Sequence, residues 1–306
     1  MKRKETEYKI NEAYDEIVHR LSGDGRTGRL PGYAQAVQHR SKFACCGRLL
    51  MTSYGREVAH WCRRPVCPTC ATFWGRKLGR GLIAACPEAG AGDYRMLTLI
   101  VGLAPSPDEA FDQFRALRRA LGNALDYRRR ATGIDRAGWR AFGVAGALEV
   151  DQFQADDFGR LGDRKQRQLR GLGFDPRQAH GSYWVSTVHA LVHVGALGDA
   201  TVTALFDGLA PIVHVQALNP HQSLAENAEG VVGYASKIRL ETALAGGETR
   251  PWPPEATADY LAATMRCSRG RQGFKISIRP ARLRKDKRKS IQQPKAECLE
   301  PMPVLF

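Results

Sequence analysis

The stretch at residues 184–194 constrains the fold of this chain more than any other. It is rich in β-branched and apolar residues and contains no Gly or Pro, which is the composition of a strand in a buried sheet. Side chains alternate between the two faces of a strand. One face is apolar throughout and must pack into a core: Val188, Ala190, Val192 and Val194. The other face carries polar groups that need water, a metal ion or a partner: Thr187, His189 and His193, with Leu191 between them.

Further elements are expected on both sides of this strand. Apolar runs predict strands at residues 94–102, 142–150, 212–218 and 274–278. Apolar spacings of three and four, or favourable composition, predict helices at residues 11–21, 106–131, 198–209, 223–244 and 256–265. Ser106 and Ser223 each precede a glutamate by three residues, as in a capping box. We interpret residues 151–181 as a surface excursion between two adjacent strands and residues 246–254 as a linker.

Five of the eight cysteines lie within one short segment: Cys45, Cys46, Cys62, Cys67 and Cys70. Cys67 and Cys70 form a Cys-x2-Cys pair on a Pro-bearing turn, so they can present two thiolates to one ion. We therefore expect a structural zinc site of four thiolates, in which either Cys45 or Cys46 completes the shell. Buried free thiols or a redox pair are the alternatives, and His60 could substitute for one ligand.

The charge balance points to a polyanionic partner, because the formal net charge is +15. Seven basic residues lie within residues 279–289, beside one Asp, and suit phosphate contacts. They are Arg279, Arg282, Arg284, Lys285, Lys287, Arg288 and Lys289. A solvated, disordered tail is the alternative for this run.

The sequence carries no signal for a membrane or for export. No apolar run approaches the roughly 20 residues that span a bilayer, and the first residues lack the core of a signal peptide. A cytoplasmic location is expected, where thiols stay reduced and cysteines more often bind metal than form disulfides.

Three further residues could carry chemistry. Tyr234 and Lys237 lie three residues apart in the predicted helix 223–244, so one turn sets the phenol and the ammonium on the same face. Glu149 stands near the end of the strand 142–150, where it could bind a metal ion or be a solvated carboxylate. His214, in the strand 212–218, is interpreted as a structural histidine.

Several of these segments resemble rolling-circle replication initiators of the HUH endonuclease superfamily. The sequence W-V-S-T-V-H-A-L-V at residues 184–192 aligns without a gap with their WHPHFHVLV-type strand. The L-T-L strand, the L-E-V strand ending near Glu149, and the Tyr-x-x-Lys helix follow in the family's order. The cysteine segment, followed by Trp74 and basic residues, is similar to one that precedes the catalytic domain in many plasmid initiators.

The resemblance implies an α+β fold, with a central antiparallel sheet flanked by helices. Residues 43–80 would form the zinc module, residues 94–279 the nicking domain, and residues 1–42 and 280–306 a polar helical segment and a basic tail. Tyr234 would attack a DNA phosphodiester at a replication origin, single-stranded or in a cruciform, and remain linked to the 5′ phosphate. Lys237 would support the phenolate or the phosphate. The 3′ hydroxyl would be the primer for a host polymerase, and a host helicase would be a further partner.

The same resemblance implies that His189 and Glu149 bind Mg²⁺ or Mn²⁺. Thr187 stands where the family has its first metal histidine, and His193 is about 13 Å from His189 along a strand, too far to share one ion in the usual way. His193 could instead contact DNA or close a neighbouring shell. Three outcomes remain open for the metal. The ion could be held by His189, Glu149, substrate oxygens and water; His180 could supply the missing imidazole; or the nuclease could be impaired.

Two other classes of protein fit parts of the sequence. A zinc-containing, sequence-specific DNA-binding protein, a repressor or a degenerate initiator, would explain Thr187 and the basic tail. An RNA-binding zinc-ribbon protein would explain the charge and the cysteines but not Tyr234.

Overall fold

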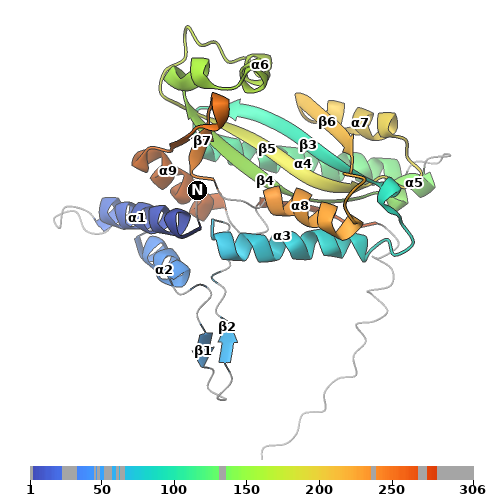
Figure 1. Cartoon of the computed structure of the whole chain (residues 1–306), viewed down its shortest axis with the longest axis horizontal. Helices are drawn as coiled ribbons and strands as arrows, with labels where there is room; N and C mark the ends of the chain where they lie inside the picture. The colour runs from blue at the N-terminus through green and yellow to red at the C-terminus, as the bar shows by residue number, and fades with distance from the viewer. Residues whose placement is uncertain are drawn as a thin grey trace, which may run out of the picture.

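A five-stranded antiparallel sheet forms the centre of the computed structural model (Figure 1). The structure describes residues 3–22, 33–44, 46, 49–51, 57–59, 62, 66–130, 136–235, 239–267 and 274–280. The strand order is β6-β3-β5-β4-β9, and every neighbouring pair is antiparallel. The strands are β3 (Tyr94–Ala104), β4 (Gly143–Gln154), β5 (Ser182–His193), β6 (Ile212–Ala217) and β9 (Lys275–Ile278). The predicted α+β fold with a central antiparallel sheet is confirmed.

Strand β5 occupies the middle of this sheet, between β3 and β4. Its apolar face is buried as expected: Val188, Ala190 and Val192 are each 0% exposed. The register places Thr187 opposite both Ile100 of β3 and Glu149 of β4. Two residues further along β5, His189 lies opposite Thr98 of β3 and Ala147 of β4. The polar face of β5 therefore lies beside that of β4, although these residues are about 40 positions apart in sequence.

Helices cover both faces of the sheet (Figure 1). On one face, α4 (Pro107–Arg130) buries Phe111, Phe114 and Leu117 in the same core as Val188. Its N-terminus is capped by Ser106, whose hydroxyl accepts from the Glu109 backbone N–H at 3.3 Å. The short α5 (Arg136–Ala141) and α9 (Pro254–Cys267) join this layer.

The opposite face is covered by α3 (Pro68–Ile83) and α8 (Leu224–Ala235), which lie side by side. Leu82, Ala228 and Val232 of these helices pack on Ala145 and Leu191 of the sheet. The helices approach closely at a glycine: a Cβ on Gly79 would lie 3.3 Å from the Ala228 carbonyl oxygen. Small side chains at this crossing let both helices reach the sheet.

The N-terminal part contains more structure than the sequence predicts. Helix α1 (Arg3–Ser22) is longer than the expected helix at 11–21, and α2 (Tyr33–Ala44) was not predicted. Ile10, Tyr14 and Phe43 of these helices belong to the same core cluster as the cysteines. A small two-stranded sheet follows, formed by β1 (Leu49–Met51) and β2 (Glu57–Ala59).

Two predictions for the segment 223–254 are wrong: the end of the helix and the interpretation of residues 246–254 as a linker. The helix expected at 223–244 ends at Ala235 within the described residues, and β7 (Glu241–Ala243) pairs with β8 (Thr249–Pro251). The expected linker at 246–254 is thus the turn and second strand of a hairpin. Gly246 and Gly247 have φ of 71° and 84°, a backbone conformation that glycine adopts readily.

The segment 151–181 is more ordered than a surface excursion. It holds the end of β4, a 3₁₀ helix at Ala155–Arg160 and α6 (Asp163–Gly171), and Phe153, Phe158 and Phe174 form a small core there. As predicted, it connects adjacent strands. The remaining elements are α7 (Asp199–Asp207) and 3₁₀ helices at Ala91–Asp93 and Ala245–Gly247. Among the helices of the described ranges, none has the length and apolar content of a membrane span.

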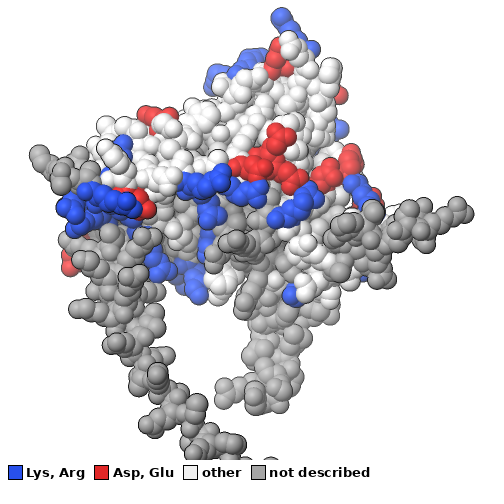
Figure 2. Space-filling model, turned by 180° about the vertical axis from the view of Figure 1, so that it is seen from behind, with Lys and Arg blue, Asp and Glu red and all other residues white. Residues whose placement is uncertain are grey.

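The face of the molecule that points away from the viewer in Figure 1, here called the far face, carries charges of both signs (Figure 2). Figure 2 shows Lys and Arg gathered toward one side of this face and Asp and Glu nearer the other. Helix α4 has the same polarity, with Asp108 and Glu109 in its first turn and arginines 128–130 in its last. This arrangement complements the helix dipole. The basic excess of the chain is therefore not explained by one uniformly positive surface on this side.

Candidate functional site

Four cysteine thiols converge at the start of α3. The Sγ atom of Cys46 lies 3.5 Å from that of Cys70 and 3.4 Å from that of Cys67, and the Sγ atoms of Cys62 and Cys70 are 3.6 Å apart. All four ligand atoms lie within 4.8 Å of one another. Sulfur atoms bound to one zinc at about 2.3 Å in a tetrahedron would be roughly 3.8 Å apart. The four thiols could therefore hold a metal ion, and their spacing is compatible with structural zinc.

Local structure explains why Cys67 and Cys70 face one point. Cys67 is the N-cap of α3 and Pro68 occupies its first turn, where the missing N–H of proline costs no hydrogen bond. One helical turn then returns the chain to Cys70, which is buried like Cys62 and Cys67. The expected ligands Cys62, Cys67 and Cys70 thus lie together with Cys46, whereas Cys45 and His60 lie outside the described residues.

The neighbouring Cys70 thiol and burial oppose ionisation of the Cys67 thiol. A hydrogen bond with Cys62 lowers the pKa of Cys67, but the hydrogen bond with Cys70 and burial outweigh it and raise that pKa to about 12. Since zinc binds the thiolate form, occupation of this cluster would release protons.

A second group of polar side chains lies on the central strand. His189 Nε2 is 2.9 Å from Glu149 Oε2, and its Nδ1 is 3.1 Å from the Thr98 hydroxyl oxygen. Because a carboxylate only accepts, the imidazole Nε2–H donates to Glu149, and in the neutral ring Nδ1 accepts from the Thr98 O–H. Thr187 lies directly opposite Glu149 in the ladder. The sheet register therefore brings together three of the predicted site residues, His189, Glu149 and Thr187.

These residues line a cavity of about 710 Å³ between the sheet, α6 and α8. Most of the residues that line it are polar, although Met96, Ile100, Leu218 and Val231 contribute apolar surface. Besides the three residues above, the polar ones include Asp151, Arg164, Gln168, His214, Gln216, Asn219, Gln222 and Asn227. Carboxylate, imidazole and hydroxyl groups thus lie around one cavity, but within the described residues three or more His, Cys, Asp or Glu ligand atoms come close enough to hold one metal ion at the four cysteines and not here.

Helix α8 forms one wall of this cavity through Asn227, Gly230 and Val231. Tyr234 lies in the same helix, one turn after Gly230 and Val231. Lys237 lies outside the described residues, so the relation of Tyr234 to Lys237 is not described. The helix backbone thus carries position 234 beside the cavity that contains His189 and Glu149.

The start of α8 is held by a set of side-chain hydrogen bonds. The predicted capping box is present: Ser223 Oγ accepts from the Glu226 N–H at 3.2 Å, and Glu226 Oε2 accepts from the Ser223 N–H at 2.7 Å. The Ser223 hydroxyl also donates to Glu226 Oε2 at 2.7 Å, and this bond, with the one from the Ser223 N–H, lowers the pKa of Glu226. Asn227, which is buried, accepts from the Asn219 N–H at 2.9 Å and donates back to the Asn219 carbonyl at 3.0 Å. Both devices fix the helix that carries Tyr234 against the loop after β6.

The other histidines differ from their sequence interpretations. His193 is buried, its Nδ1 lies 2.8 Å from the Ala141 carbonyl oxygen, and its ring packs on Tyr94. It is a structural residue, and the suggestion that it contacts DNA is wrong. His180 is exposed and does not line the cavity, so the structure does not bring it to His189.

His214 is the residue that sequence reasoning missed. It was interpreted as structural, yet it lines the cavity and lies opposite Thr98, the hydrogen-bond partner of His189. Its Nε2 is buried and has no hydrogen-bond partner among the described residues. The alternation of β6 could have signalled this, because Thr98 and His214 share a face once β3 and β6 are paired.

Tyr260 is a second tyrosine close to Glu149 but is not a candidate nucleophile. Burial, with the charges of Glu149 and Asp151, raises its pKa. Its ring is stacked between Trp184, at 6.0 Å between centroids, and Phe111, at 5.9 Å. The phenol is therefore part of the core.

Comparisons with known proteins give no match: no protein-family model matches the chain, and no curated protein or solved structure does.

Proposed function

We propose that this protein is a rolling-circle replication initiator, with an HUH-like nicking domain that cleaves one DNA strand through Tyr234. One observation carries the proposal. A histidine–carboxylate pair, His189 and Glu149, lies on the central strands of an antiparallel sheet, in a cavity walled by the helix that contains Tyr234. That juxtaposition is the arrangement which a metal-dependent tyrosine nuclease needs. A cytoplasmic protein acting with a host helicase and polymerase fits this proposal.

In the proposed reaction the phenolic oxygen of Tyr234 attacks the scissile phosphorus. A P–O bond to tyrosine forms and the P–O3′ bond breaks, which gives a 5′-phosphotyrosine link and a free 3′ hydroxyl. The phenol loses its proton, and the departing 3′ oxygen gains one. Lys237, three residues on, would stabilise the phenolate or the phosphate. An aryl phosphodiester retains the bond energy, so a later 3′ hydroxyl can reverse the link.

His189 and Glu149 would hold Mg²⁺ or Mn²⁺, which supplies charge neutralisation at the scissile phosphate. His189 Nε2 and Glu149 Oε2, which lie 2.9 Å apart, are the two atoms that would hold the ion. Thr98 keeps the imidazole oriented from its other nitrogen. Of the outcomes considered for Thr187, the geometry favours an ion held by His189, Glu149, water and substrate oxygens, because Glu149 lies directly opposite position 187.

We also propose that the four-cysteine cluster holds zinc. Its role would be structural, because four thiolates complete a tetrahedral shell and leave no position for substrate. The cluster would fix α3 to the N-terminal helices, whose side chains share its core.

The test is the formation of a covalent protein–DNA adduct. Protein is incubated with Mn²⁺ and a supercoiled plasmid carrying the DNA that flanks its own gene. The unaltered protein should give nicked circles and a 5′-linked adduct, and Tyr234→Phe should give neither while still binding DNA. Tyr127→Phe, at a 76% exposed tyrosine of α4, is the matched control and should nick normally. An adduct formed by Tyr234→Phe would show that another residue is the nucleophile.

A zinc-containing DNA-binding protein without nuclease activity is the second candidate. Thr187 favours it, because a threonine opposite Glu149 adds no imidazole to the His189–Glu149 pair. Sequence-specific binding of the same plasmid fragment, with no nick at any Mn²⁺ or Mg²⁺ concentration, would support this candidate instead.

A further inference from the structure

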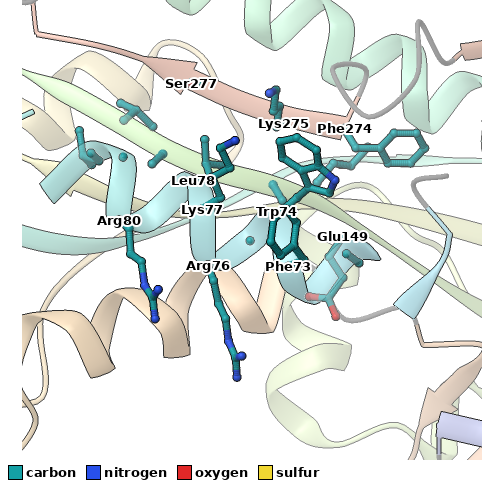
Figure 3. A pocket seen from close by; sticks show the side chains of 18 of the residues that line it. Phe73, Trp74, Arg76, Lys77, Leu78, Arg80, Glu149, Phe274, Lys275 and Ser277 are labelled. Carbon is teal, nitrogen blue, oxygen red and sulfur yellow. The ribbon is translucent and has the colours of Figure 1, made fainter. Parts of the chain in front are cut away.

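A second cavity of about 860 Å³ lies between α3 and the strands β4 and β9 (Figure 3). It is bounded by α3, the edge of β4 and the short strand β9, with Arg239 and Tyr260 completing the wall. We call it the α3 groove. Strand β9 pairs only with residues Val144 to Ala147 of β4, so the lining continues along β4 to Glu149 and Val150 beyond the end of β9.

The lining of the α3 groove is strongly basic. Its cations come from three separate parts of the chain: Arg76, Lys77, Arg80, Arg239, Lys275 and Arg279. Among the described residues that line it, Glu149 is the one acidic side chain. The far face, in contrast, mixes both signs (Figure 2). A groove with this charge is complementary to a polyanion.

Five of these cations divide into two sets, and the sixth, Arg239, lies beside Glu149. Arg76 and Arg80 extend toward α8 (Figure 3), where both make ion pairs with Glu229. Lys77 extends the other way, toward the strand that carries Lys275. Lys77 and Arg279 are exposed. Lys77, Lys275 and Arg279 form the second set and are better placed to meet phosphates. The ion pairs of Arg76 and Arg80 attach α3 to α8.

Aromatic side chains lie among the cations. Phe73 is 44% exposed, and its ring makes an edge contact with Trp74 at 5.5 Å. Lys77 Nζ lies 5.0 Å from the centroid of the Trp74 ring. An exposed ring beside phosphate-binding cations can stack on an unpaired base. Bases in a duplex are already stacked and cannot use it, so the combination favours a single strand over a duplex.

The α3 groove leads to the candidate site. Glu149 lines both cavities: its Oε2 faces His189, and its Oε1 lies 3.9 Å from Arg239 Nε. A strand lying in the groove would reach the carboxylate that is proposed to hold the metal.

We propose that the α3 groove binds single-stranded DNA next to the scissile phosphate, with Lys77, Lys275 and Arg279 on phosphates and Phe73 stacked on one base. This inference rests on the proposed function for the identity of the strand. The zinc-bearing helix α3 would then serve as a wall of a DNA-binding groove in addition to its place in the fold.

Binding of a fluorescent 12-nucleotide oligothymidylate, which contains no chosen nick site, tests the groove in the absence of divalent metal. Phe73→Ala should weaken binding about tenfold, as expected for one lost base–aromatic stack. Lys77→Ala with Arg279→Ala should weaken it further at low salt. The double variant should also lower the slope of log affinity against log salt by about 1.4, since each phosphate contact in a single strand contributes roughly 0.7.

Matched controls lie on α4, across the sheet. Tyr127→Ala removes an exposed aromatic, and Arg119→Ala removes an exposed cation, and both should bind as the unaltered protein does. Metal content and the thermal unfolding midpoint show whether Phe73→Ala and Lys77→Ala keep the zinc helix intact. Arg279 lies outside α3, so a loss of oligothymidylate affinity in Arg279→Ala alone cannot come from damage to that helix.

Equal loss of affinity in the α3 and α4 variants would overturn the proposal, and so would tighter binding of a 12-base-pair duplex than of the single strand. Stronger binding of the matching oligouridylate would assign the groove to RNA and also overturn it. The proposed function fails differently. If the protein never nicks but the α3 variants selectively lose oligothymidylate, the groove stands and the nuclease does not.

Discussion

The two candidate metal centres of this protein differ in kind. At the N-terminal end of α3, four identical soft donors lie within 4.8 Å of one another, and three of them are buried. On the central strands, one imidazole and one carboxylate meet at 2.9 Å, with hydroxyls beside them, and the group opens into a cavity of about 710 Å³. The first set offers four ligands to one ion, whereas the second offers two side chains and, as a proposed metal site, would leave positions for water or substrate.

Because of that difference, we expect the cysteine cluster to affect protein stability and the His189–Glu149 site to affect the proposed reaction. A closed thiolate shell contributes folding free energy and offers no site for a reactant, while an open shell with hard donors can accept a phosphate oxygen. We therefore expect loss of a cysteine to affect folding first and loss of His189 or Glu149 to affect nicking first. Four substitutions test this separation.

His189→Ala should have the largest effect on chemistry. Removal of the imidazole leaves Glu149 without its partner and the cation without a nitrogen ligand, so metal-dependent nicking should fall roughly 1000-fold. Nicking rate against Mn²⁺ concentration measures this. His180→Ala, at an exposed histidine outside the cavity, is the control. Normal nicking by His189→Ala would mean that the central strand carries an incidental histidine.

Cys70→Ser should act on folding. One thiolate is lost from the tetrahedral set, so bound zinc should drop from about one per chain to none, and the free energy of unfolding should decrease by about 3 kcal/mol. Metal analysis and chemical denaturation give both values. Cys86→Ser, at a half-buried cysteine outside the cluster, should retain the metal. Zinc-free unaltered protein, freshly purified and reduced, would contradict the assignment.

Thr187→His should strengthen the open site. It would place two imidazoles on one face of β5, about 7 Å apart along the strand, with Glu149 opposite the new one. The Mn²⁺ concentration needed for half-maximal nicking should fall about tenfold, equivalent to about 1.4 kcal/mol of added binding free energy. Thr98→His is not equivalent, because it removes the hydroxyl that orients His189. Unchanged metal dependence in Thr187→His would argue against a metal site on this strand.

His214→Ala should have the smallest effect. Its imidazole lies across β3 from His189, opposite Thr98, and can act only at the edge of the shell or on substrate. A roughly threefold rise in the apparent Km for an oligonucleotide substrate, with little change in kcat, would correspond to about 0.7 kcal/mol of lost binding. A loss as large as that of His189→Ala would make His214 a primary ligand.

Much of the scaffold was predictable, but not the helix that carries the cysteines. The strand at 184–194 was identified from its alternation and the helix at 106–131 from its apolar spacing, and both are present. Helix α3 was missed because its buried face is made of small residues: Cys70, Ala71, Gly75 and Gly79, with Leu82. Such small residues also occur in loops and turns, and glycines disfavour a helix on propensity alone.

Sequence by itself determined the local features of this protein, which depend on residues close together in the chain. The alternation in β5 decided which side chains are buried, and the Cys-Pro-x-Cys spacing decided that two thiols share one turn. Tertiary structure alone decided that Glu149 reaches His189, that Cys46 and Cys62 join Cys67 and Cys70, and that α3 and β9 enclose one groove. The physical reason is that strand register and helix packing depend on contacts between distant segments, and a shift of one residue would move Glu149 to the other face of the sheet.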